Sequence, residues 1–254
     1  MKEIKFIFSI LIKNKLKDYI FFTIIGFSII FCFLLLFSNF LFIGEKNKVF
    51  IDLGIAGINF ILLISSIYFS SECFPEIKKN KFINWLLSLP IKKYHIFMGS
   101  FLYISTLLFI IALFYNGLYF LFFVFFKVNF SKKFLVYFSL NFLKFLILSV
   151  IGLIITIKYN TYTGMLSLFC IYFIGCYTFN FLQYLIKKGF YKVISIGKVI
   201  YYIFPDFQIP DLTANITHLR AIDLSILLQA IIYYFSYLII FLLIGAVLFE
   251  KNEL

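Results

Sequence analysis

Charged residues are scarce in this chain, and their scarcity decides the class of protein. Of its 254 residues only 13% are charged, about half the usual share of a soluble protein, whereas 63% are hydrophobic and 39 are phenylalanine. A soluble fold of this length has too little interior to hide so much apolar surface. The composition therefore excludes a soluble protein and predicts an all-α, polytopic membrane protein with a single transmembrane domain over residues 1–254.

Several other features are missing. Arg220 is the only arginine, so the net charge of +12 comes almost wholly from lysine. Without a soluble basic domain to carry it, this charge belongs to the membrane–water boundary and indicates no nucleic-acid partner. The four cysteines show no Cys-x-x-Cys spacing, and His95 and His218 stand far apart, which gives no reason to propose a metal site.

Sequence motifs for catalysis are also missing. There is no His-Glu-x-x-His, no Gly-x-Ser-x-Gly and no intramembrane aspartate pair, so an enzyme is not expected. The phosphate-binding run Gly-x-x-x-x-Gly-Lys-Ser/Thr is absent as well. The chain is therefore not expected to bind and hydrolyse ATP in that way, and a pump built from it needs a separate ATPase subunit.

Long apolar runs make up most of the chain. A spanning helix needs about 20 mostly apolar residues, and six segments meet this requirement. The predicted spans cover residues 19–43, 49–70, 96–126, 134–157, 161–186 and 224–249. Residues 1–17 are too rich in lysine to span and show apolar residues at helical spacing, which predicts a basic amphipathic helix in the membrane interface. Lysines gather there and after the second span, which favours cytoplasmic termini in a cell membrane.

The loop over residues 71–95, between the second and third spans, is the most informative segment. Its first half is charged. Its second half is one or two apolar helical turns that carry the only tryptophan, Trp85, and stop at Pro90. Such a short amphipathic helix either rests on lipid headgroups or docks into a groove of another protein, and the residues alone leave both open.

The run from Trp85 to Phe101 reads Trp-Leu-Leu-Ser-Leu-Pro-Ile-Lys-Lys-Tyr-His-Ile-Phe-Met-Gly-Ser-Phe, and Glu76 with a polar stretch precedes it. This pattern resembles the cytoplasmic loop of type-2 ABC transporter permeases. In that family a glutamate precedes a run of the form leu-leu-ser-x-pro-ile-ser-arg, and a gly-lys pair opens the next span. Residues 86–91 match the centre. Residues 92–93 are both lysine where a small residue and arginine are usual, and Gly99-Ser100 replaces glycine–lysine.

The resemblance implies a fold and partners. It implies six spans, an interfacial N-terminal helix, a coupling helix in the 71–95 loop, and a partly re-entrant external segment before the sixth span, where residues 187–223 lie. It also implies a cytoplasmic ABC ATPase in two copies and a second permease chain, in a homodimer or a heterodimer. ATP and magnesium would bind the ATPase, and no cofactor would bind this chain.

The coupling loop is where the resemblance places contacts with the ATPase. Glutamates and lysines would supply the polar contacts, and Phe82, Trp85 and Leu86 the apolar anchor. The alternative for the charged residues is a solvated loop. The expected coupling residues are Glu72, Glu76, Lys78, Lys79, Lys81, Phe82, Trp85, Leu86 and Pro90.

Two polar residues inside the spans are candidates for a substrate path. Lys144 falls well inside the fourth span, where a lysine is costly unless it is paired or reaches the interface. It either lines a path, pairs with Asp52, or belongs to a span that starts later. Asn59 is a second candidate, although asparagines in spans more often join neighbouring helices.

The cargo is not specified by any ladder of charged residues. The apolar spans suit export of an amphipathic or hydrophobic substrate, such as a peptide, bacteriocin, toxin or drug. Small permeases of this kind also resemble those of metalloenzyme-maturation systems, which is an alternative. A further alternative is an ATP-independent secondary transporter or channel, although no repeat relates the two halves.

Overall fold

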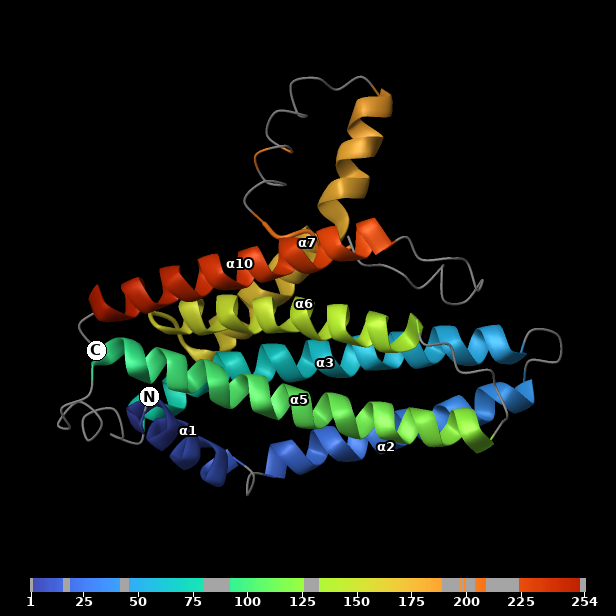
Figure 1. Ribbon diagram of the computed structural model, residues 1–254, viewed down its shortest axis with the longest axis horizontal. Coiled ribbons are helices and arrows are strands. Elements are labelled where there is room, and N and C mark those ends of the chain that lie inside the picture. Colours follow the sequence, from blue (N-terminus) through green and yellow to red (C-terminus); the bar gives the residue numbers. More distant parts are fainter. Residues whose placement is uncertain are drawn as a thin grey trace.

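Helices make up most of the residues that the structure describes. The computed structural model describes residues 2–15, 19–41, 46–79, 92–125, 133–188, 197, 199, 204–208 and 224–251, and no strand occurs among them. The helices of these residues are α1 (Lys2–Lys15), α2 (Tyr19–Leu41), α3 (Lys46–Lys79), α5 (Lys93–Phe125), α6 (Lys133–Thr156), α7 (Thr161–Lys188) and α10 (Leu224–Lys251). Figure 1 shows most of them running along one common direction.

Five of these helices are long and apolar enough to cross a membrane. They are α3, α5, α6, α7 and α10, whereas the apolar stretch found on α2 covers only Tyr19–Leu34. The composition-based prediction of a multi-pass membrane protein is therefore confirmed. The predicted count of six spans depends on α2, which is a continuous helix of 23 residues.

α6 lies at the centre of the bundle. Every residue from 144 to 153 is buried, and α3, α7, α10 and α5 all pack against this helix. Small residues allow close contact here. A Cβ at Gly152 would lie 2.2 Å from Ser70 Oγ of α3. The Thr156 hydroxyl oxygen lies 2.9 Å from the Gly152 carbonyl of its own helix and 3.3 Å from the Ser70 carbonyl of α3. Small and hydroxyl-bearing residues at such contacts are typical of membrane helices.

α7 and α10 are less enclosed than the central helices. Only 17% of the spanning window of each is buried, against 67% for α6. Along most of α7 large apolar side chains are exposed, including Phe169, Phe173, Tyr177 and Phe181. Figure 1 shows the second half of α7 rising away from the other helices. Exposed apolar faces of this kind require lipid or protein around them.

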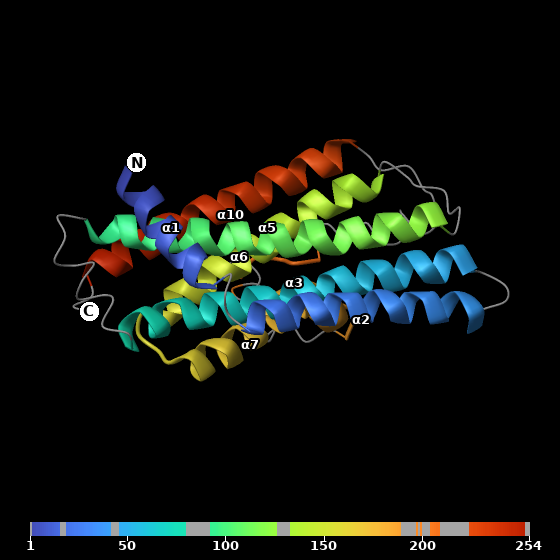
Figure 2. The same cartoon turned by 90° about the horizontal axis from the view of Figure 1, so that it is seen from below.

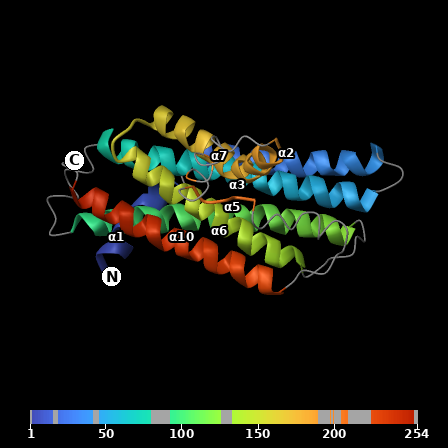
Figure 3. The same ribbon diagram turned by 90° about the horizontal axis from the view of Figure 1, so that it is seen from above.

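The start of α1 and the end of α10 lie at the same end of the bundle, as Figures 1 and 2 show. The last turn of α3 and the first turn of α5 lie at that end too, as Figure 3 also shows. α1 packs across the start of α5. Ile7 is fully buried there, and Glu3 Oε2 lies 2.5 Å from His95 Nδ1. α1 is thus a helix within the predicted range 1–17, and its location in the membrane interface stays a prediction.

The second predicted span is shorter than the observed helix. It was expected to end at Ser70, with residues 71–95 forming a loop, but α3 continues to Lys79 and contains Pro75. The charged residues in this stretch suggested a loop. Cys73, Phe74 and Ile77 are nevertheless buried, so one face of the extension packs on the bundle and keeps it helical despite the proline.

Candidate functional site

The final turns of α3 carry acidic residues into a hollow at one end of the bundle. Tyr68, Glu72 and Glu76 recur at intervals of four residues, so they lie on one face of the helix. α2 and α7 supply the other walls. The hollow has a volume of about 440 Å³, and its lining residues are Ile20, Tyr68, Glu72, Glu76, Thr161, Tyr162 and Met165.

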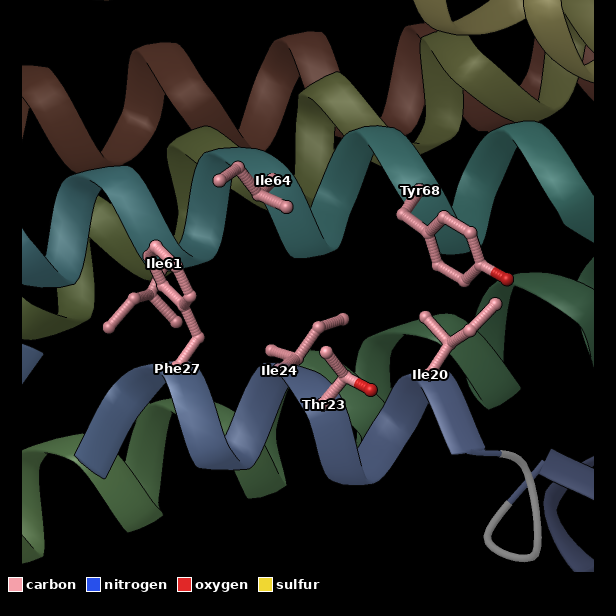
Figure 4. Close-up of a pocket in the computed structure, with 7 residues that line it drawn as sticks. All are labelled: Ile20, Thr23, Ile24, Phe27, Ile61, Ile64 and Tyr68. Atoms are coloured by element: carbon pink, nitrogen blue, oxygen red, sulfur yellow. The ribbon is translucent and has the colours of Figure 1, made fainter. Parts of the chain in front are cut away.

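An apolar groove lies between α2 and α3. Its volume is about 250 Å³, and Figure 4 shows its lining side chains facing one another from the two helices. They are Ile20, Thr23, Ile24 and Phe27 from α2 with Ile61, Ile64 and Tyr68 from α3. The Thr23 hydroxyl donates to the Tyr19 carbonyl at 2.9 Å. The hydrogen of that hydroxyl is therefore used within α2.

The groove and the acidic hollow meet. Ile20 and Tyr68 line both of them. The groove covers residues 61–68 of α3, and the acidic residues follow one and two turns later on the same helix. Glu72 lies about 10 Å and Glu76 about 4.5 Å from the end of α3 at Lys79. The combined space thus has an apolar body inside the bundle and an acidic end near the end of a spanning helix.

Four of the expected coupling residues, Glu72, Glu76, Lys78 and Lys79, fall on the described part of α3. Glu72 and Glu76 face the hollow. Lys78 Nζ donates to the Ile157 carbonyl at 2.7 Å, at the end of α6. This contact, which the sequence did not predict, joins the ends of α3 and α6. The remaining five expected coupling residues lie outside the described residues, and they are Lys81, Phe82, Trp85, Leu86 and Pro90.

Lys144 is enclosed by protein. It is only 8% exposed, and its Nζ lies 4.9 Å from the centre of the Phe145 ring and 5.5 Å from that of Tyr172 on α7. Aromatic faces at such distances stabilise a cation electrostatically. The expectation that the fourth span starts later, so that Lys144 reaches the interface, is wrong, because α6 begins at Lys133 and the ammonium lies between helices.

Asn59 joins two helices. Its Nδ2 donates to Tyr137 Oη of α6 at 2.7 Å, which confirms the interpretation of Asn59 as an interhelical contact. This bond also sets the register of α3 against α6. Asp52 lies seven residues before Asn59, and Lys144 lies seven after Tyr137. Because the two helices run parallel, Asp52 and Lys144 are about 21 Å apart along the axis, so the expected pairing between them is wrong.

Part of the segment expected to be external and partly re-entrant packs against the bundle, whereas its position relative to a membrane stays a prediction. Residues 204–208 lie between α7 and α10, and Pro205, Asp206 and Phe207 are buried. The Asp206 amide donates to Tyr233 Oη at 2.9 Å, and Tyr234 Oη donates to the Asp206 carbonyl at 3.0 Å. Of the expected external segment 187–223, only residues 187, 188, 197, 199 and 204–208 are described.

Metal ligation finds no support in the described part of the chain, where no group of three His, Cys, Asp or Glu residues is placed to hold a metal ion. No protein-family model matches the sequence, and no curated protein matches it. What the chain does therefore has to be inferred from its own residues and geometry.

Proposed function

We propose that this chain is the transmembrane permease subunit of an ATP-driven exporter. Two permease chains, identical or related, would work with two copies of a cytoplasmic ATPase that binds ATP and magnesium. The chain would lie in the cell membrane with six spans, of which α2 is the first, and with both termini in the cytoplasm. Its cargo would be amphipathic or hydrophobic.

One observation carries this proposal. α3 runs without interruption from its apolar span to Lys79, and α5 begins at Lys93. The intervening connection, which contains residues 85–92 of the permease-like run, therefore joins two bundle helices at the end where both termini lie (Figures 1 and 2). A coupling element needs such a position, because force applied to it must reach the spanning helices.

The contacts of α3 support a route for that force. Lys78 binds the end of α6, Ser70 packs closely against Gly152, and Asn59 binds Tyr137 farther along the same helix pair. α3 and α6 are thus joined at three levels. A push from the ATPase would move them together, provided that the ATPase contacts two permease states differently.

Glu72 and Glu76 precede this coupling element in the chain and lie on α3. We therefore assign the apolar contact with the ATPase to Phe82, Trp85 and Leu86, before Pro90, and the nearby polar contacts to Lys79 and Lys81. Glu72 and Glu76 line the hollow between α2, α3 and α7. Their side chains are partly buried there.

Gentle purification of the tagged chain from its native membrane tests the proposal. We expect an ATPase subunit to copurify in stoichiometric amount and to be lost from a Trp85→Ala/Leu86→Ala variant. Tyr159→Ala is the matched control, because Tyr159 is an exposed aromatic in the turn between α6 and α7. Recovery of the wild-type chain without an ATPase would contradict the proposal, as would equal loss from the control.

A second candidate is an ATP-independent secondary transporter, and the enclosed Lys144 favours it. Ionisable residues buried within a membrane bundle often belong to ion or proton pathways. Transport into vesicles separates the two candidates. Export that follows an imposed ion gradient without ATP, and that is lost in Lys144→Met, would support the second candidate against the first.

A further inference from the structure

We propose that the groove between α2 and α3 and the acidic hollow at its end form one binding site for a cationic amphiphile. The apolar part of the ligand would lie in the groove, and its cationic head would lie against Glu72 and Glu76. As a statement about cargo, this inference rests on the proposed export function. As a statement about binding, it stands on the geometry alone.

The apolar compartment fits the body of such a ligand. The groove presents aliphatic and aromatic side chains from two helices, as Figure 4 shows, and Ile64 and Phe27 at its rim are 40% and 47% exposed. The hydrocarbon chain of a ligand in the surrounding lipid can therefore enter the groove from the side. Lipid tails are as apolar as the groove, so apolar contact alone gives little selectivity. Selectivity has to come from the other end.

That end is acidic. Glu72 and Glu76 lie one helical turn apart, with Cβ atoms about 5–6 Å from each other, close enough for both carboxylates to contact one ammonium or guanidinium group. Both residues also interact with other groups of the chain, so a bound cation would share carboxylates that are already held in place. Tyr162 adds an aromatic face, which also attracts cations.

The surroundings favour a positive charge in the hollow. The chain carries 23 basic and 11 acidic residues, yet of the described residues that line this hollow none is basic. The ammonium of Lys78, one turn beyond the acidic pair, is turned to the Ile157 carbonyl. Two carboxylates in the described lining of the hollow, which contains no basic residue, favour a cationic head over an anionic one.

The order of the two compartments also matches an amphiphile in a bilayer. The acidic residues follow Ser70, where the predicted apolar span of α3 ends and a membrane helix is expected to meet the headgroups, and the groove continues inward from them. From Ile61 to Glu76 the site is about 22 Å long. A single-chain amphiphile would keep the orientation it has in the membrane, with its head at the boundary and its chain inside.

Binding of radiolabelled dodecyltrimethylammonium to the purified chain in nanodiscs tests this inference. We expect saturable binding that dodecanol, an uncharged competitor of equal chain length, does not displace. Glu72→Gln/Glu76→Gln should weaken binding about 10- to 100-fold, since the electrostatic attraction of two nearby carboxylates for the quaternary ammonium is lost. Glu250→Gln, an exposed glutamate at the end of α10, should leave it unchanged.

A second pair of variants tests the apolar compartment without altering charge. Ile64→Phe should fill part of the groove and weaken binding, whereas Leu121→Phe, on an exposed face of α5, should not. Unchanged binding in the glutamine double variant, if it still elutes as a monodisperse protein, would overturn the inference. Displacement of the probe by dodecanol, or by phosphatidylethanolamine added to phosphatidylglycerol nanodiscs, would overturn it as well.

The binding and export tests fail independently. Binding that depends on the two glutamates, without any ATP-dependent movement of the probe in vesicles that contain the ATPase, would support the site and contradict the export function. ATP-dependent export of dodecanol or the probe that is unaffected by the glutamine variants would support the export function and contradict the site.

Discussion

Gly175 provides a test of how the segment 204–208 is held in the bundle. A Cβ added at this glycine of α7 would lie 2.5 Å from Phe207 Cδ2 and 2.7 Å from the Pro205 carbonyl oxygen. The second of these is a backbone atom, so no rotation of a side chain removes the clash. The Gly175→Ala variant would therefore have to move the segment away from α7 by about 0.7 Å to reach ordinary contact.

That displacement has a cost that can be worked out. The Phe207 amide donates to the Gly175 carbonyl at 3.2 Å, and a shift of this size would break that bond. Overfilling a packed contact costs about 1–3 kcal/mol. Opening of residues 204–208 would then be favoured by about 5- to 150-fold relative to wild type.

Hydrogen exchange in nanodiscs measures this opening directly. The amides of Asp206, Phe207 and Gln208 all donate hydrogen bonds, so each should exchange about 5- to 150-fold faster in Gly175→Ala. The control is Gly117→Ala on α5, where the described part of the chain has nothing within 4 Å of the added Cβ. Unchanged exchange at residues 206–208 in Gly175→Ala would refute the packing argument.

Two further predictions concern the joined helices α3 and α6. Lys78→Met removes the hydrogen bond to the Ile157 carbonyl and should lower the free energy of unfolding by about 1 kcal/mol, since the side chain is exposed. Thermal unfolding in detergent measures this change, with Lys187→Met as the control. If Lys78→Met lowers the stability no more than the control does, the contact contributes nothing. A double-mutant cycle of Asn59→Leu with Tyr137→Phe should give a coupling of about 0.6 kcal/mol, whereas zero coupling would show that the bond contributes nothing.

The sequence predicted the apolar helices well because their signal is local. A run of about 20 apolar residues has to be a helix in lipid, where every backbone group needs an internal partner. Of the six spans predicted from this signal, five are helices long and apolar enough to cross a membrane. The predicted end of the second span at Ser70 was wrong because the signal is only local. Charge in residues 72–79 marks exposure to water, but it does not show that Cys73, Phe74 and Ile77 pack on other helices.

The candidate site was only half visible in the sequence. Glu72 and Glu76 were singled out as coupling residues because they stand before the permease-like run. Their position in a hollow with Ile20 of α2 and Tyr162 of α7 could not be predicted, because these residues come from segments more than 50 positions away on either side. The spacing of residues within one helix does not show which faces of other helices that helix contacts. The register of α3 against α6, which separates Lys144 from Asp52, could not be predicted either, because it depends on contacts between the two helices.

Composition showed that this chain needs a membrane. The local order of residues determined which segments become helices and where charge gathers, since both depend on residues close together in the sequence. Only the tertiary structure decided that α3 continues to Lys79, that Lys144 is enclosed by aromatic rings, and that an apolar groove opens into an acidic hollow. These features depend on how helices pack side by side. That packing is set by the close fit of small and large side chains, such as Gly152 against Ser70, in which the contacting residues belong to different helices.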